Sequence, residues 1–180
     1  MRKELEAPLW LCHLRLKGKY LTSGYDSAVY KDGGYVIKVY KGNPSAASLP
    51  VPGATLVLYR QVTNAAFEIA ETEGLQMELI YSKETLPFKI NPIITMEKCE
   101  ECGFVESVAP HVPGKNLATV PGIFDPIELK LSLRYLNNAL EDKLGVSGIN
   151  IIPVNIKKVD GNLVVTDLCS DIISLRRKVQ

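Results

Sequence analysis

The stretch Leu163-Val164-Val165-Thr166-Asp167 is typical of a short apolar strand that ends in an acid. Asn155 precedes that acid by twelve residues, and Lys38 lies far upstream within a second apolar run, Val36-Ile37-Lys38-Val39. An unpaired charge in an apolar environment is costly, or it neutralises by shifting its pKa, so strands carry lone charges reluctantly. We therefore expect Lys38, Asn155 and Asp167 to converge on one ligand, and a polyphosphate with its metal ion would suit all three.

The composition is that of a globular chain with one domain or one small two-lobed unit. Of the 180 residues, 46% are hydrophobic and 23% are charged, which are ordinary values. The net charge of +1 gives no electrostatic footprint for nucleic acid, and no apolar run is long enough to span a membrane. The N-terminus does not resemble a secretory signal. We expect a cytoplasmic protein whose four cysteines are reduced thiols.

The N-terminal part is predicted to consist of strands, one helix and a second hairpin. The turn Lys31-Asp32-Gly33-Gly34 is a hairpin signal between apolar runs. The segment 54–73 is predicted to be a helix because apolar residues recur at the helical period. Those apolar positions are Tyr59, Val62, Ala66, Ile69 and Ala70. The expected strands are 16–21, 28–30, 35–40, 92–98 and 104–108.

The C-terminal part is predicted to contain one main helix and a hairpin. Asp125 suits the N-cap, Pro126 the first helical position, and Glu128 completes an arrangement like a capping box. The turn Asp160-Gly161 predicts a hairpin between strands 151–159 and 162–166. The expected buried stripe of the helix is Ile127, Leu131, Tyr135, Leu136 and Leu140.

Two N-terminal segments resemble motifs of the protein-kinase-like fold, which includes protein kinases and small-molecule kinases of the aminoglycoside phosphotransferase type. Residues 22–29 correspond to the Gly-rich loop pattern G-x-G-x-x-G-x-V. Only Gly24 is kept, and Thr22 and Ser27 stand where the outer glycines would be. The run Val36-Ile37-Lys38 resembles the V-A-I-K strand.

Further segments extend the resemblance over most of the chain. Residues 104–108 followed by 113–117 look like the fifth strand and the hinge, where adenine would hydrogen-bond to backbone. The resemblance implies an α+β, two-lobed fold with an antiparallel sheet and one helix in the N-lobe. We expect the N-lobe to span 1–112 and a reduced C-lobe to span 113–180.

The resemblance also implies ATP and Mg²⁺ as ligands, because Mg²⁺ prefers oxygen ligands and substrate phosphates. Asn155 and Asp167 would hold the metal. A helix glutamate would hold Lys38; Glu71 is favoured, with Glu68 and Glu73 as alternatives. The implied nucleotide-binding residues are Gly24, Ser27, Val29, Lys38, Glu71, Glu106 and Val108.

The catalytic loop departs from the family pattern. Residues 148–155 correspond to H-R-D-x-x-x-x-N, and Asn150 stands at the position of the catalytic base. An amide does not accept a proton as a carboxylate does, so phosphorylation would lose a contribution of ~10²–10⁴-fold. Only residues 168–180 follow Asp167, so we expect no peptide-substrate groove of the usual kind.

Plainer structural explanations exist for the same residues. Lys38 also fits an edge strand with its ammonium in water, Gly24 a simple turn, and Asp167 a cap after a strand. The pair Cys99 and Cys102 has metal-like spacing, but a zinc site needs four ligands, and a hairpin turn with two thiols is favoured.

Three functions remain open. The first is a pseudokinase-like regulator that binds ATP and Mg²⁺ with weak or absent phosphotransfer. The second is an active small atypical kinase that phosphorylates a small molecule or a protein. The third is a non-enzymatic interaction module with a vestigial nucleotide site. We expect a protein partner or a homodimer through the reduced C-lobe, because a C-lobe this small leaves apolar surface to cover.

Overall fold

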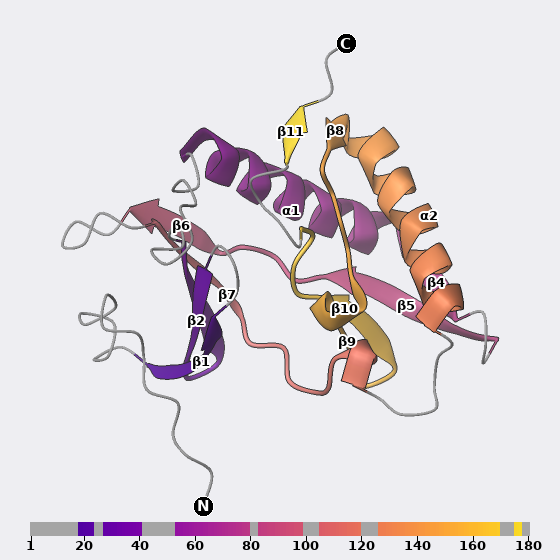
Figure 1. Ribbon diagram of the computed structural model, residues 1–180, viewed down its shortest axis with the longest axis horizontal. Coiled ribbons are helices and arrows are strands. Elements are labelled where there is room, and N and C mark those ends of the chain that lie inside the picture. Colours follow the sequence, from indigo (N-terminus) through magenta and orange to yellow (C-terminus); the bar gives the residue numbers. More distant parts are fainter. Residues whose placement is uncertain are drawn as a thin grey trace, which may run out of the picture. The chain divides into compact units, whose positions relative to one another are not determined.

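Figure 1 shows the chain as a computed structural model. The structure describes residues 18–23, 27–40, 53–79, 83–98, 105–119, 126–169 and 175–177. Contacts divide the chain into two compact units. Unit 1 comprises Met1–Gly53 with Ile93–His111, and unit 2 comprises Ala54–Pro92 with Val112–Gln180.

Unit 1 is an antiparallel sheet with the strand order β1-β2-β3-β7-β6. The predicted hairpin between β2 and β3 is present, and Gly33 adopts the positive φ that its turn requires. One face buries Ala28, Tyr30 and Val39, and the rings of Tyr20 and Tyr30 meet edge to face, 5.5 Å apart. The strands are β1 (Lys19–Ser23), β2 (Ser27–Asp32), β3 (Tyr35–Tyr40), β6 (Thr95–Lys98) and β7 (Val105–Pro110).

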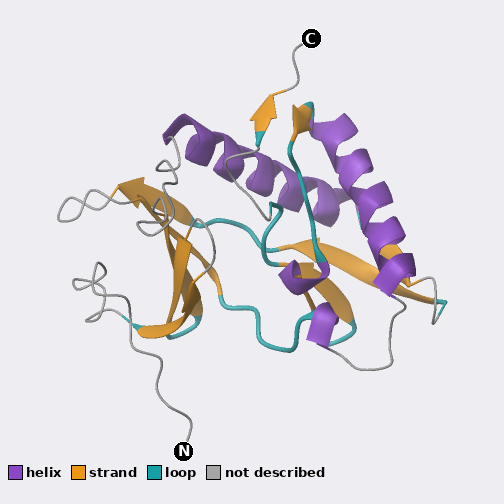
Figure 2. Cartoon of the chain, viewed as in Figure 1, coloured by secondary structure: helices purple, strands orange, loops and turns teal. Residues whose placement is uncertain are grey.

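Unit 2 combines two helices with a four-stranded sheet, β4-β5-β10-β9, and a small pair, β8 and β11. Figure 2 shows the helices and strands in the view of Figure 1. The helices are α1 (Gly53–Glu73) and α2 (Pro126–Leu144), with short 3₁₀ turns η2 (Leu117–Thr119) and η3 (Pro153–Asn155). The strands are β4 (Gln76–Leu79), β5 (Glu84–Ile90), β8 (Val146–Ser147), β9 (Ile156–Val159), β10 (Asn162–Val165) and β11 (Arg176–Arg177).

The prediction of an α+β fold with an antiparallel N-terminal sheet and two helices is confirmed. The helix predicted at 54–73 is α1, and the predicted C-terminal hairpin is β9 and β10. Asp160 and Gly161 at its tip both have positive φ, as the tight turns favoured in hairpins require. Within the described residues, neither helix is long and apolar enough to cross a bilayer.

Strands β4 and β5 were not expected from the sequence. They bury alternate residues, Met77 and Leu79 on β4 and Leu86, Phe88 and Ile90 on β5. β5 then pairs in parallel with β10, which lies more than seventy residues further along the chain. This pairing explains why residues 54–92, expected in the N-lobe, group instead with the C-terminal residues.

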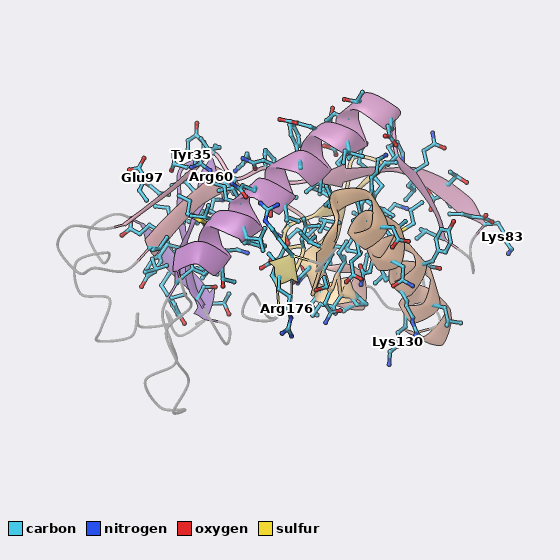
Figure 3. All side chains as sticks on the ribbon, turned by 90° about the horizontal axis from the view of Figure 1, so that it is seen from above. Tyr35, Arg60, Lys83, Glu97, Lys130 and Arg176 are labelled. Atoms are coloured by element: carbon cyan, nitrogen blue, oxygen red, sulfur yellow. The ribbon has the colours of Figure 1, made fainter. Side chains whose placement is uncertain are left out.

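The buried face of α2 differs from the predicted stripe. Leu133 and Leu140 are buried, whereas Leu131 and Tyr135 are 58% and 81% exposed. The reason is Asn137, which faces inward: its Oδ1 accepts from the backbone N–H of Ile151 at 3.1 Å. A polar residue in the middle of the buried stripe hid the correct helical phase. Leu136 is half-buried, Ile127 lies among the side chains outside the description, and Lys130 extends outward (Figure 3).

This assignment of the α2 face predicts opposite outcomes for two substitutions on one helix. Leu133→Ala should lower the free energy of unfolding by about 2–5 kcal/mol, because it leaves a cavity in the core. Tyr135→Ala should change it by no more than about 0.5 kcal/mol, because the ring is exposed. Urea denaturation measures both, and a larger loss for Tyr135→Ala than for Leu133→Ala would contradict the assignment.

Candidate functional site

Asp167 follows a strand that is held on both sides. β10 lies between β5, its parallel partner, and β9, its antiparallel partner, and Leu163 and Val165 are almost fully buried. The backbone N–H of Asn91 donates to the carbonyl of Val165 at 2.8 Å, which extends the pairing to the end of the strand. The strand thus fixes where the segment 166–169 begins.

Asn155 is attached directly to this segment. The backbone N–H of Thr166 donates to the carbonyl oxygen of Asn155 at 2.7 Å, and the Thr166 hydroxyl donates to the same oxygen at 3.1 Å. Asn155 closes η3, and the next residue, Ile156, is fully buried opposite Val165. The structure therefore brings the predicted metal-binding residues Asn155 and Asp167 onto adjoining backbone segments.

The carboxylate of Asp167 is held by two donors. The hydroxyl of Tyr59, on α1, donates to Oδ1 at 2.5 Å, and the backbone N–H of Cys169 donates to the same oxygen at 3.3 Å. The first distance is typical of a charge-assisted O–H···O⁻ bond. Sequence analysis missed this role, because it assigned Tyr59 only to an apolar stripe. The available signal was the hydroxyl itself, since a buried tyrosine O–H usually has a partner.

Asn150 lies beside the same segment. Its backbone N–H donates to the carbonyl of Leu168 at 2.9 Å, and it forms an isolated parallel bridge with Cys169. Its side chain is exposed, whereas Leu168 and Cys169 are buried. The residue expected at the catalytic-base position is thus next in space to the residues that follow Asp167.

Lys38 is a half-buried residue in the middle of the unit 1 sheet. It pairs with Val29 on β2 and with Ser107 on β7, and paired residues of antiparallel strands share a face. Ser107 is buried, and its hydroxyl donates to the hydroxyl of Tyr40 on this face at 3.2 Å. Lys38 therefore does not occupy an edge strand, and polar groups share its face.

The two expected hinge residues lie on the other face of that sheet. Glu106 pairs with Val39, and Val108 pairs with Ile37. Their strand, β7, is flanked by β3 and β6, and the carbonyl of Val108 accepts from the N–H of Ile94 at 2.8 Å. Since β7 makes ladder bonds on both sides, adenine contacts at these two positions stay a prediction.

The remaining expected site residues are not brought to Asp167 by any described contact. Glu68, Glu71 and Glu73 are all exposed on α1, and Glu73 forms an ion pair with Lys143 at the end of α2. Ser27 is half-buried at the start of β2. Gly24, Cys99 and Cys102 lie outside the described residues.

A metal ion at this site would need ligands beyond the protein. Over the part of the chain that the structure describes, no group of three or more His, Cys, Asp or Glu side chains could hold a metal. Asn155 and Asp167 offer an amide and a carboxylate oxygen, and Mg²⁺ commonly takes one or two protein ligands together with phosphates and waters. The donor set therefore fits a magnesium–nucleotide complex better than a closed protein cage.

Two solved structures of kinases are similar to this chain, although no protein-family model and no curated protein matches it. WbdD in complex with a kinase inhibitor gives a TM-score of 0.46 at 14% identity, covering 89% of this chain. The kinase domain of PknI from Mycobacterium tuberculosis gives 0.47 at 13% identity, covering 84%. The chain spans 33% of the length of the first and 57% of the second.

The helix that carries Tyr59 also contains a buried hydroxyl. Thr63 lies one turn further along α1, so its side chain neighbours that of Tyr59 on the helix surface. Its hydroxyl is buried and has no hydrogen-bond partner among the residues that the structure describes. A buried hydroxyl without a partner lowers the stability of the fold.

Replacing that hydroxyl with a methyl group should stabilise the protein. We expect Thr63→Val to raise the free energy of unfolding by about 1–2 kcal/mol, because the shape is kept and the desolvated oxygen is removed. Thr72→Val, at an exposed position of the same helix, is the matched control and should have little effect. A loss of stability in Thr63→Val by urea denaturation would show that the hydroxyl has a partner.

Proposed function

We propose that this protein binds ATP with Mg²⁺ in a kinase-like site and transfers phosphate weakly or not at all. The observation that supports it most is the attachment of Asn155 to the segment that leads into Asp167. The sequence resemblance assigns these two residues to the metal. They are twelve positions apart in the chain, and their meeting depends on the β9–β10 hairpin.

Each group has a chemistry that suits this role. Oxygen ligands from Asp167 and Asn155 suit Mg²⁺, which neutralises phosphate charge when it is bound with ATP. The ammonium of Lys38 is a compact point charge that suits the α- and β-phosphates. Its setting in the middle of a sheet, on a face with Ser107 and Tyr40, supports a positioned lysine rather than a solvated one.

Weak phosphotransfer follows from Asn150. Its side chain is exposed beside the segment after Asp167, and it is an amide where the family has a carboxylate. Without a proton acceptor there, transfer to a hydroxyl would lose ~10²–10⁴-fold, while binding and positioning of the nucleotide would remain. A nucleotide-dependent regulator is therefore favoured over an efficient kinase.

Stability measurements with nucleotide test the binding proposal. ATP with Mg²⁺ at 100 times its Kd should add about 2.7 kcal/mol to the free energy of unfolding. Lys38→Met and Asp167→Ala should each remove most of this gain, because each removes a charge that contacts the phosphates or the metal. Lys130→Met, on the exposed face of α2, removes the same charge elsewhere and should keep the full gain.

Two results would contradict the proposal. An unchanged stability of the wild-type protein at millimolar ATP and Mg²⁺ would leave only an interaction module with a vestigial site. Turnover of radiolabelled ATP at a rate usual for kinases, lost in Asp167→Ala, would instead identify an active small kinase.

A further inference from the structure

We propose that Tyr59 is a positioning residue that orients the Asp167 carboxylate for the metal ion. The inference rests on the proposed function, since it gives Asp167 the role of metal ligand. Tyr59 itself touches neither metal nor nucleotide in this role. It acts through its hydrogen bond to Oδ1 of Asp167, across 108 residues of sequence.

The geometry of Tyr59 suits a fixed donor. Its side chain is only 2% exposed, so its ring is held by packing. Leu56, Val62 and Ala66 are buried on the same helix and anchor that face of α1 in unit 2. A ring confined in this way presents its hydroxyl in one direction, which preorganises the acceptor.

The position of α1 is fixed by contacts beyond Tyr59. The guanidinium of Arg177 on β11 donates to Oε1 of Gln61 at 3.1 Å, and Lys143 on α2 pairs with Glu73. These contacts connect the helix to the C-terminal residues near both of its ends. The phenol hydroxyl is therefore carried by an element that is anchored independently of Asp167.

The hydrogen bond is compatible with metal binding at the same carboxylate. An ionised carboxylate has two oxygens with about four acceptor sites, and the Tyr59 hydroxyl and the Cys169 N–H both donate to Oδ1. These two donors do not exhaust the capacity of the group. Donors that hold a metal-binding carboxylate restrict its orientation, and their loss typically costs 10–100-fold in metal affinity.

The test compares metal dependence with stability in the full chain. Nucleotide binding is followed by isothermal titration calorimetry with ATP at increasing Mg²⁺. Tyr59→Phe should raise the Mg²⁺ concentration needed for half-maximal binding by about 10–100-fold, because the ring stays and only the oriented donor is lost. Binding of ATP without Mg²⁺ should be unchanged.

Val62→Ala is the matched control. It removes buried volume from the same helix and should destabilise the protein, but it leaves the phenol–carboxylate bond intact. Its Mg²⁺ dependence should equal that of the wild-type protein. If Tyr59→Phe is too unstable to measure, the same titration is made in the background of Thr63→Val.

The outcomes separate this inference from the function beneath it. If the wild-type protein binds ATP in a Mg²⁺-dependent way and Tyr59→Phe shows the same dependence, the positioning role is overturned and the proposed function stands. If Val62→Ala shifts the dependence as much as Tyr59→Phe does, the effect is one of stability and the inference also fails. If the wild-type protein shows no Mg²⁺-dependent binding, the proposed function itself fails.

Discussion

The pairing of β10 with β5 on one side and β9 on the other is the constraint on which the candidate site depends. It buries Leu163 and Val165 and fixes the end of the strand through the bond from Asn91 to Val165. Thr166 then uses both its N–H and its hydroxyl to hold the carbonyl of Asn155. Without this pairing, an amide and a carboxylate twelve residues apart would have no reason to meet.

The same pairing changes how the chain is divided. A parallel partner for β10 is supplied by β5, which follows α1 in sequence, so α1 and its hairpin join the C-terminal residues in one unit. Tyr59 strengthens that connection with a buried donor to Asp167. The helix that the sequence resemblance assigns to holding Lys38 is thereby tied, within unit 2, to the segment with the expected metal ligands.

Local signals in the sequence predicted what local chemistry determines. The Asp-Gly turns predicted both hairpins, and apolar periodicity predicted α1. The β5–β10 pair was missed because a parallel pairing between distant segments has no local turn signal. The buried face of α2 was wrong because Asn137, a polar residue, occupies an inward position to bond the Ile151 backbone. Tyr59 was missed because its apolar ring and its donor serve different partners.

The central claim is that Lys38, Asn155 and Asp167 serve one nucleotide, and paramagnetic relaxation by Mn²⁺ with a non-hydrolysable ATP analogue tests it most directly. Amide signals of Lys38 and Val39 on β3 and of Asn155 and Asp167 in unit 2 should all broaden together, while Tyr135 on the exposed face of α2 should broaden less. The broadening should disappear in Asp167→Ala. Broadening confined to one of the two units, or unchanged in Asp167→Ala, would contradict the claim.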